Sequence, residues 1–291
     1  MYRSWLFVPG DSERKLTRCL DAGADALIFD LEDSVTPQRK GDARQMVAEF
    51  LRAPRAPDGP ALYVRINPWG TDMAADDLDA VMAGAPDGIM QPKTQSAQDV
   101  IALGAALTAQ EDACGGERGT TRILPIVTET PRAVFNLNSY TVGVPRLVGL
   151  TWGAEDLGAA IGASDRRDEA GQWLAPFELV RNLTLFAAHG AEVEAIDTLH
   201  GDFRDLDALQ AHATAARRIG FTGKLAIHPA QVAPINAAMT PGDDEIAHAQ
   251  RIVEAFEAAP GAGAVSLDGQ MLDRPHLRAA RRLLAVAPDR R

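Results

Sequence analysis

The chain has 291 residues, 46% of them hydrophobic and 24% charged, a composition typical of a folded protein with a large core. Its 29 Lys and Arg residues against 40 Asp and Glu residues give a formal net charge of −11. This acidic balance disfavours nucleic-acid binding, so we expect no nucleic-acid partner. Two cysteines, Cys19 and Cys114, are too few for a disulfide framework, and we interpret both as reduced thiols.

Membrane association is also not expected. No apolar run approaches the ~18 residues that a helix needs to cross a bilayer. The first apolar run, residues 5–8, stops at Pro9 and is too short for the apolar core of a signal peptide. We therefore expect a soluble, cytoplasmic protein.

Short apolar runs alternate with alanine-rich helical stretches along most of the chain. The predicted strands are 4–8, 25–31, 61–66, 88–92, 122–128, 146–152, 193–198 and 224–228, and helical stretches between them include 37–53, 96–111 and 205–219. Strands that alternate with helices indicate a parallel sheet, and eight of them are the number that closes a (β/α)8 TIM barrel. An open doubly wound sheet is the alternative, but the first strand lacks the G-x-G-x-x-G turn of dinucleotide binding.

The pattern changes after residue 240. A predicted helix over 243–258 is followed by a Pro/Gly spacer, by the segment 265–269 and by a last helix from about 275. We therefore predict a catalytic barrel domain over 1–240 and a C-terminal helical extension over 241–291. Because the extension is not needed to close the barrel, it can pack on a neighbouring subunit, which predicts a homo-oligomer.

Charged side chains follow the predicted strands, at the barrel end where enzymes of this fold carry their chemistry. They are Asp30, Glu32, Asp33, Arg65, Lys93, Glu129 and Asp156. So many carboxylates favour a hard divalent cation such as Mg²⁺, which prefers oxygen ligands. Zinc is disfavoured because His228 is the only histidine at a strand end and no H-x-x-x-H pair exists.

The acids differ in how strongly they point to function. Glu129 and Asp156 each follow an apolar strand, and Asp156 lies in a glycine-bounded turn whose backbone N–H groups can receive a carboxylate. Asp30 and Asp33 have the alternative of capping the turn that follows them. Glu155 has the alternative of a solvated surface side chain.

The basic residues at the strand ends also have two interpretations each. Arg65 can bind a carboxylate or stabilise an oxyanion, and it can equally form a salt bridge with Asp30 or Glu32. We expect Arg65→Ala to leave the fold intact while nearly abolishing turnover. Lys93 is interpreted as an ion-pair partner rather than a Schiff-base nucleophile, and His228 as a hydrogen-bonded framework residue.

A basic cluster stands near the N-terminus of this acidic protein. It consists of Arg3, Arg14, Lys15 and Arg18. One interpretation is a solvated helix face. The other is a clamp for a phosphate-bearing ligand at the mouth of the barrel.

Motifs in order along nearly the whole chain resemble one family. They are SWLFVPGD (4–11), GADALIFDLEDSV (23–35), VRINP (64–68), PK (92–93), GAEDL (153–157), AIDT (195–198), GKLAIHP (223–229) and DGQMLD (268–273). Together they resemble the citrate lyase beta and malyl-CoA lyase group of the HpcH/HpaI aldolase/citrate lyase family.

The resemblance implies a Mg²⁺-dependent TIM-barrel carbon–carbon lyase. Its substrate would be a β-hydroxyacyl-CoA such as malyl-CoA or citramalyl-CoA, cleaved to or formed from an acyl-CoA and a 2-keto acid, glyoxylate or pyruvate. Members are usually trimers or hexamers. Two further readings stay open: a malyl-type CoA thioesterase or malate synthase-like activity at the same site, and the acyl-carrier-dependent beta subunit of a citrate lyase complex.

The resemblance also implies roles for individual residues. The catalytic residues would be Arg65, Glu129 and Asp273, with Asp273 reaching a neighbouring active site, and the metal ligands would be Glu129 and Asp156. The residues that contact the substrate would be Arg65, Glu129, Gly153, Ala154, Glu155 and Asp156. The metal-bound waters would be surrounded by Asp30, Glu32, Asp33 and Lys93, and the CoA phosphates would be bound by Arg14 and Lys15.

Overall fold

The structure is a computed structural model that describes residues 1–287. Eight strands form one parallel sheet: β1 (Ser4–Pro9), β2 (Ala26–Asp30), β3 (Ala61–Arg65), β4 (Gly88–Gln91), β5 (Arg122–Pro125), β6 (Gly149–Thr151), β7 (Glu194–Asp197) and β8 (Gly223–Ala226). Their order in the sheet is β5-β4-β3-β2-β1-β8-β7-β6. All eight lie within the predicted strand ranges or within one residue of them.

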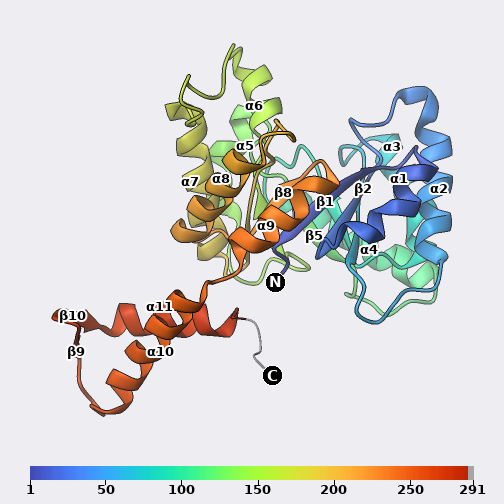
Figure 1. Ribbon diagram of the computed structural model, residues 1–291. Helices are drawn as coiled ribbons and strands as arrows, with labels where there is room; N and C mark the ends of the chain where they lie inside the picture. Colours follow the sequence, from blue (N-terminus) through green and yellow to red (C-terminus); the bar gives the residue numbers. More distant parts are fainter. Residues whose placement is uncertain (288–291) are drawn as a thin grey trace.

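The sheet curls into a nearly closed barrel (Figure 1). Single parallel bridges from Ile123 to Leu147 and from Ile126 to Thr151 join its two outer strands, β5 and β6. The α/β fold class and the eight-stranded TIM barrel predicted from the sequence are therefore confirmed.

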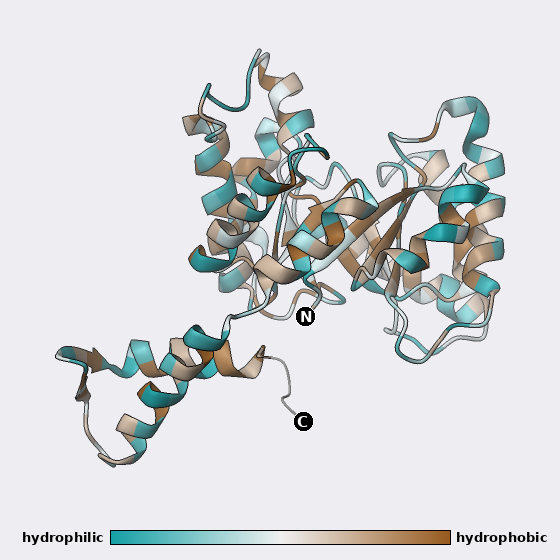
Figure 2. Cartoon of the chain, viewed as in Figure 1, coloured by the Kyte–Doolittle hydropathy of each residue, from teal (hydrophilic) through white to brown (hydrophobic). Residues whose placement is uncertain are grey.

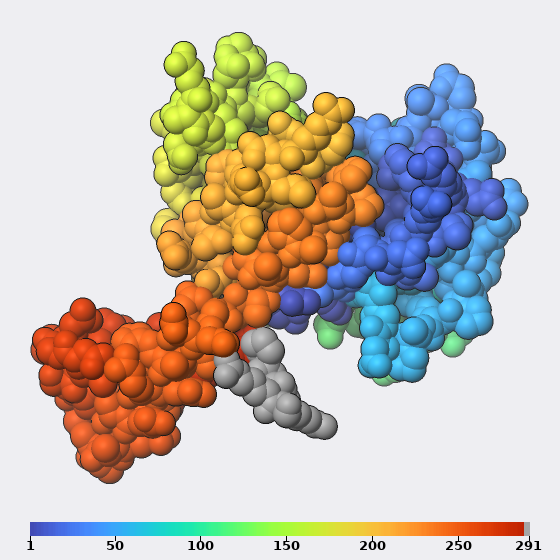
Figure 3. Space-filling view, in the orientation of Figure 1, coloured from blue at the N-terminus to red at the C-terminus, as the bar shows by residue number. Residues whose placement is uncertain are grey.

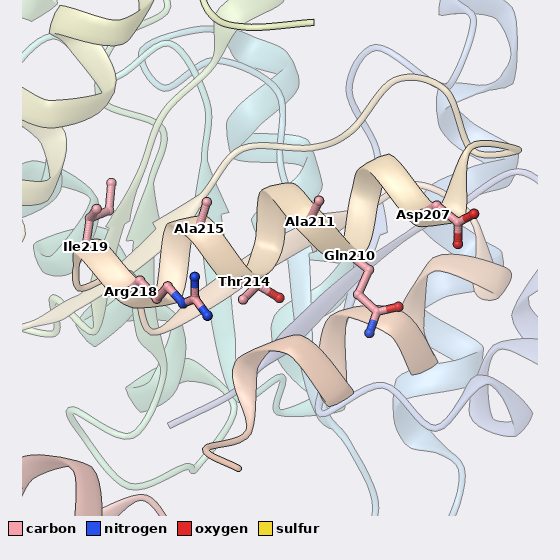
Figure 4. A pocket seen from close by; sticks show the side chains of 7 residues that line it. All are labelled: Asp207, Gln210, Ala211, Thr214, Ala215, Arg218 and Ile219. Atoms are coloured by element: carbon pink, nitrogen blue, oxygen red, sulfur yellow. The ribbon is translucent and has the colours of Figure 1, made fainter. Parts of the chain in front are cut away.

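Helices follow the strands and cover the outside of the barrel. They are α1 (Glu13–Arg18), α2 (Lys40–Arg52), α3 (Asp72–Val81), α4 (Ala97–Ala113), α5 (Pro131–Phe135), α6 (Ala154–Ile161), α7 (Ala175–Gly190), α8 (Leu206–Ile219) and α9 (Val232–Met239), with short 3-10 turns at 19–22, 37–39, 82–84, 137–139 and 229–231. A groove of about 610 Å³ is lined by residues along α8, from Asp207 to Ile219 (Figure 4).

The barrel interior is filled by apolar side chains from alternate strand positions, and the strands appear brown in Figure 2. Trp5 and Tyr63 meet edge to face at the centre, with ring centroids 4.9 Å apart. Gly88 makes room for Tyr63, because a Cβ at Gly88 would lie 2.1 Å from the tyrosine ring. The barrel interior is thus a packed core, and the active site of such a fold lies at the C-terminal ends of the strands.

The chain leaves the barrel after α9 and forms an extension that stands apart from it (Figures 1 and 3). The extension contains α10 (Asp243–Glu257), the hairpin strands β9 (Ala264–Leu267) and β10 (Gln270–Asp273), and α11 (Arg274–Ala285). Its small core includes Ile252, Phe256 and Leu277. An ion pair of 2.8 Å between Arg217 of α8 and Glu245 of α10 ties its base to the barrel.

Within residues 1–287, no helix combines the length and the apolar character that a membrane span requires.

Candidate active site

Strand register brings Asp30 and Arg65 together. The two residues are direct neighbours at the C-terminal ends of β2 and β3. Arg65 Nε and Nη2 donate hydrogen bonds of 2.7 Å to the two Asp30 carboxylate oxygens. Asp30 also accepts the backbone N–H groups of Glu32 and Ser34, at 2.9 and 3.0 Å. The salt bridge and the turn cap, each expected as an alternative, are therefore both present.

These contacts set the charge of Asp30. Burial acts to raise the pKa of the carboxyl group, but the hydrogen bonds and the charge of Arg65 outweigh it and hold the pKa below its ordinary value. Asp30 is therefore a carboxylate at neutral pH, and its negative charge holds the Arg65 guanidinium in place.

Lys93 sits among the carboxylates at the centre of this end of the barrel. Its Nζ donates to Glu32 Oε1 at 2.7 Å and lies 3.2 Å from Asp156 Oδ1 and 3.7 Å from Asp33 Oδ2. Partial burial acts to lower the pKa of Lys93, yet the carboxylates raise it above its ordinary value. The lysine is thus a charged ion-pair partner, as the sequence analysis favoured, and a poor Schiff-base nucleophile.

Glu32 is buried between Arg65 and Lys93. Its Oε2 lies 3.0 Å from Arg65 Nη1 but without the geometry of a hydrogen bond. Burial raises the pKa of Glu32 despite the two cations beside it. Glu32 therefore has unused hydrogen-bonding capacity in a cationic surrounding, which suits a group that accepts from a bound water.

Glu129 lies in the loop between β5 and α5 and is only 3% exposed. Its Oε2 accepts the backbone N–H of Lys93, which adopts a positive φ of 53°. Gly153 passes so close that a Cβ there would lie 2.9 Å from Glu129 Cγ. Burial raises the pKa of Glu129 to about 8; the Lys93 N–H acts against this rise, and the charges of Glu32 and Asp156 add to it.

Asp156 lies in the first turn of α6, with Gly153 as the N-cap residue. The glycine-bounded turn expected here is thus the start of a helix. Asp156 contacts Lys93, whereas Glu155 points elsewhere and pairs with Arg166 at 2.6 Å. Glu155 and Ala154 line a separate cavity of about 320 Å³ beside Trp173.

Glu129 and Asp156 together suit a hard cation. Lys93 contacts both of them, Glu129 through its backbone N–H and Asp156 through its Nζ. No lysine or arginine side chain in residues 1–287 forms an ion pair with Glu129, so its buried carboxylate favours protonation until a cation arrives. The described residues hold no cluster of three or more His, Cys, Asp or Glu arranged for a metal. Two carboxylates are nevertheless sufficient for Mg²⁺, which completes its shell with waters and substrate oxygens.

Three candidate residues lie away from this centre. Arg14 and Lys15 are exposed on α1, which follows β1 at the same end of the barrel. Asp273 lies at the junction of β10 and α11 in the extension, apart from the barrel of its own chain (Figure 1). A single chain therefore does not bring together the whole predicted set.

Phe7 is a residue of this site that was not predicted from the sequence. The Arg65 guanidinium lies 4.9 Å from the centre of the Phe7 ring, so the arginine is fixed by a carboxylate and by an aromatic face. Phe7 lies two residues after Trp5 on β1, so both side chains point into the barrel. This alternation along the strand could have identified Phe7 from the sequence.

Asp197 at the end of β7 was noted in a motif but given no role. It is buried and accepts hydrogen bonds from Trp152, Arg181 and Lys224, at 2.9, 3.0 and 3.2 Å. His228 accepts the backbone N–H of Ala230 and stacks on a neighbouring ring, in keeping with a framework role. Both residues hold the strand ends in place.

An eight-stranded parallel barrel with buried acids, an arginine and a lysine at its C-terminal strand ends is the architecture of a barrel enzyme. Residues 3–229 match the family described as HpcH/HpaI aldolase/citrate lyase, and residues 179–288 match the C–C bond lyases of the TIM-barrel fold. The chain therefore belongs to the HpcH/HpaI aldolase/citrate lyase family and is a carbon–carbon bond lyase of that family.

Individual relatives cover nearly the whole chain. Citrate lyase subunit beta of Escherichia coli is 36% identical over 287 residues, which are 98% of this chain and 93% of that protein. A (3S)-malyl-CoA thioesterase of Cereibacter sphaeroides is 33% identical over 290 residues, 98% of this chain and 94% of that protein.

Solved structures agree. The CitE protein of Mycobacterium tuberculosis in complex with magnesium, acetoacetate and coenzyme A superposes with a TM-score of 0.80 at 33% identity, covering 98% of this chain and 97% of that chain. The citrate lyase beta subunit of M. tuberculosis with oxaloacetate and magnesium has a TM-score of 0.68 at 33% identity, covering 82% of this chain and 96% of that chain.

Proposed function

We propose that this chain is a Mg²⁺-dependent lyase that cleaves or forms a β-hydroxyacyl-CoA such as malyl-CoA or citramalyl-CoA, with glyoxylate or pyruvate as the 2-keto acid. The observation that carries the proposal is the contact of Lys93 with both Glu129 and Asp156, beside the buried Arg65. Two carboxylates that both contact Lys93 would offer Mg²⁺ its preferred oxygens, and the arginine would offer a site for negative charge. The magnesium complexes of the relatives support this reading.

Glu129 and Asp156 would hold the ion, which would supply Lewis-acid polarisation of a keto-acid carbonyl. Arg65 donates through Nε and Nη2 to Asp30. Its Nη1 lies 3.0 Å from Glu32 Oε2 without a hydrogen bond to it and would donate to a substrate oxygen. In this role it would bind the thioester oxygen as that oxygen gains negative charge in the enolate. Asp30, Glu32, Asp33 and Lys93 would orient the waters around the ion.

The acid–base group we assign is Asp273. It would remove the α-proton of the acyl thioester in the condensation direction and return it in cleavage. Because Asp273 lies in the extension, away from its own barrel, we assign it to the active site of a neighbouring subunit. The catalytic domain over 1–240 and the extension over 241–291 would then act together only in a homo-oligomer, a trimer or hexamer.

The CoA end of the substrate would lie over α1. Arg14 and Lys15 are exposed there, at the barrel end that carries the acids, and form no ion pair within residues 1–287. Their positive charge suits the CoA phosphates in a protein whose net charge is −11. The keto acid would contact the start of α6, at Gly153, Ala154, Glu155 and Asp156.

A second candidate function is hydrolysis of a malyl-type thioester at the same site. It is favoured by the 33% identity to a (3S)-malyl-CoA thioesterase, which spans 98% of this chain. An acyl-carrier-dependent role is favoured by the similarity to citrate lyase subunit beta. These candidates differ in the product released, so one assay can separate them.

The experiment is a mass-spectrometric assay of the purified protein. Acetyl-CoA or propionyl-CoA is mixed with glyoxylate or pyruvate, with Mg²⁺ or with EDTA. A Mg²⁺-dependent hydroxyacyl-CoA adduct supports the lyase, and free hydroxy acid with free CoA supports the thioesterase. No product with any pair, together with turnover of an acyl-carrier thioester, would replace the proposal with the carrier-dependent role.

A further inference from the structure

The proposed acid Asp273 has a close partner, His276, on the same helix end. Asp273 is the N-cap residue of α11, and His276 lies three residues later in its first turn. The distance from His276 Nδ1 to Asp273 Oδ1 is 2.6 Å. The same Nδ1 lies 3.1 Å from the backbone nitrogen of Asp273. About half of each side chain is exposed, 45% for Asp273 and 51% for His276.

One imidazole nitrogen cannot serve both contacts. To accept the backbone N–H, Nδ1 must present a lone pair; to meet a carboxylate oxygen at 2.6 Å, it must carry a proton, because two lone pairs at that distance repel. The shorter contact is to the charged group and is the stronger one. The geometry therefore favours Nδ1–H as a donor to Oδ1 over a purely helix-capping histidine.

We propose that His276 is a positioning residue that holds the Asp273 carboxylate, which also caps the His276 backbone N–H, through an Nδ1–H···Oδ1 hydrogen bond and so orients it to take the substrate proton. This inference rests on the proposed role of Asp273 in the lyase reaction. In the condensation direction the α-C–H bond breaks, its electron pair remains in the enolate and its proton goes to the Asp273 carboxylate. His276 keeps its own proton throughout, so the step balances without a further reactant.

The environment of the pair agrees with this role. The hydrogen bond from His276 is the largest influence on the pKa of Asp273 and lowers it below its ordinary value. The pair ends the β9–β10 hairpin and begins α11, so its backbone is fixed on both sides. A hydrogen bond that fixes the rotamer of an exposed acid reduces the entropy lost when that acid reaches a substrate.

Two substitutions separate positioning from helix capping. His276→Glu keeps a side chain that can accept the Asp273 backbone N–H, as a glutamate at this helix position commonly does, but it repels the Asp273 carboxylate. His276→Gln keeps both a cap and a donor for Oδ1. Arg278→Gln, an exposed change on the same helix, is the matched control.

Steady-state kinetics of the full-length oligomer give the main readout. We expect His276→Glu to lower kcat at least tenfold with KM and Tm nearly unchanged, since a positioned acid–base group contributes about 10²–10⁴-fold. His276→Gln should recover most of that loss, and Arg278→Gln should match the wild type. The added effect of His276→Glu should vanish in an Asp273→Asn background. Wild-type kcat in His276→Glu would overturn the inference and leave the histidine a helix cap.

A second measurement does not depend on turnover. Long-range ¹H–¹⁵N spectra of the free protein report which ring nitrogen of His276 carries the proton. We expect Nδ1–H in the wild type and its loss or weakening in Asp273→Asn. A His276 ring with its proton on Nε2 and none on Nδ1 would contradict the hydrogen bond from Nδ1 to Asp273, and would overturn the inference even if the lyase assay succeeds. If the lyase assay fails but Nδ1–H is found, the proposed function falls while the Asp273–His276 pair stands.

Discussion

Arg65 and Asp30 form a two-point ion pair, with both nitrogen–oxygen distances at 2.7 Å and with side chains that are 13% and 2% exposed. Parallel register between β2 and β3 sets the pair, because the two residues are direct neighbours across the strands. Arg65 also faces the buried Glu32 at 3.0 Å. The arginine thus balances the charge of two buried acids, and its Nη1, beside Glu32, is the nitrogen that we propose for the substrate.

This double role changes the expected effect of Arg65→Ala. The sequence alone predicts an intact fold with little turnover, but the structure shows that Asp30 and Glu32 would lose their buried partner. We expect the free energy of unfolding to fall by about 3–5 kcal/mol and kcat/KM to fall about a hundredfold or more. Urea denaturation and initial rates check the two effects. Near-wild-type rates in a folded Arg65→Ala protein would contradict the assigned role.

The strand-end rule predicted most of the candidate site. It placed Asp30, Arg65, Glu129 and Asp156 at one end of the barrel, because the ends of parallel strands meet there whatever the loops do. It also placed Lys93 correctly as a cation among acids. These results need only the strand boundaries and the common direction of the strands, both of which are visible in the alternation of apolar runs and helices.

Finer features depend on backbone geometry that the sequence does not reveal. The positive φ of Lys93 aims its N–H at Glu129, and nothing in the sequence marks that conformation. Glu155 and Asp156 diverge because consecutive residues of a helix differ by about 100° around its axis. The turn expected there turned out to be the first turn of α6. The position of the extension over another subunit involves a second chain and stays a prediction.

Metal binding should depend on Glu129 and Asp156 separately. We expect Glu129→Gln and Asp156→Asn each to weaken Mg²⁺ affinity at least tenfold, because each would remove one of the two proposed carboxylate ligands. Isothermal titration with Mg²⁺, and Mn²⁺ binding followed by electron paramagnetic resonance, check this without turnover. The neighbouring change Glu155→Gln should leave metal affinity unaltered, since Glu155 pairs with Arg166 instead. Unchanged affinity in both ligand variants would remove the metal site from this position.

If Asp273 completes the active site of a neighbouring subunit, as we propose, two inactive variants should complement each other. Glu129→Gln and Asp273→Asn chains should each be nearly inactive alone. Mixed oligomers should regain activity, because about one quarter of randomly assembled interfaces pair an intact barrel with an intact extension. Subunit exchange followed by rate measurement tests this. Mixtures no more active than the separate variants would place Asp273 in the site of its own chain or outside catalysis.

Neutralising the basic pair on α1 should affect substrate binding more than chemistry. We expect the double variant with Arg14→Gln and Lys15→Gln to raise KM for the CoA thioester several-fold with kcat little changed. The wild-type KM should rise with ionic strength, because exposed charges are screened over about 10 Å at 0.1 M salt. Arg52→Gln, at the far end of α2, is the control for loss of surface charge. A salt-independent KM equal in all three proteins would exclude phosphate contacts at α1.

The ion pair of Glu111 and Arg146 makes the free energy of unfolding depend on pH in the acid range. Arg146 donates two hydrogen bonds of 2.7 Å to Glu111, and both side chains are less than a tenth exposed. Burial acts to raise the pKa of Glu111, but Arg146 and the backbone N–H groups of Thr121 and Gly119 lower it to about 2. Because the native state holds this group ionised where the unfolded chain would bind a proton, the pair stabilises the fold fully above about pH 4.5 and loses its effect as pH falls toward 2.

Glu111→Gln should therefore lower the free energy of unfolding at pH 7 by roughly 3 kcal/mol, the value of about 2.5 pKa units. The difference in the free energy of unfolding between this variant and the wild type should decrease steadily from pH 5 to pH 3, because protonation removes the stabilisation by the native carboxylate. Urea denaturation at several pH values measures it, with the exposed Glu117→Gln as control. A difference that stays constant over this pH range would show that packing, rather than the charge of Glu111, accounts for the effect.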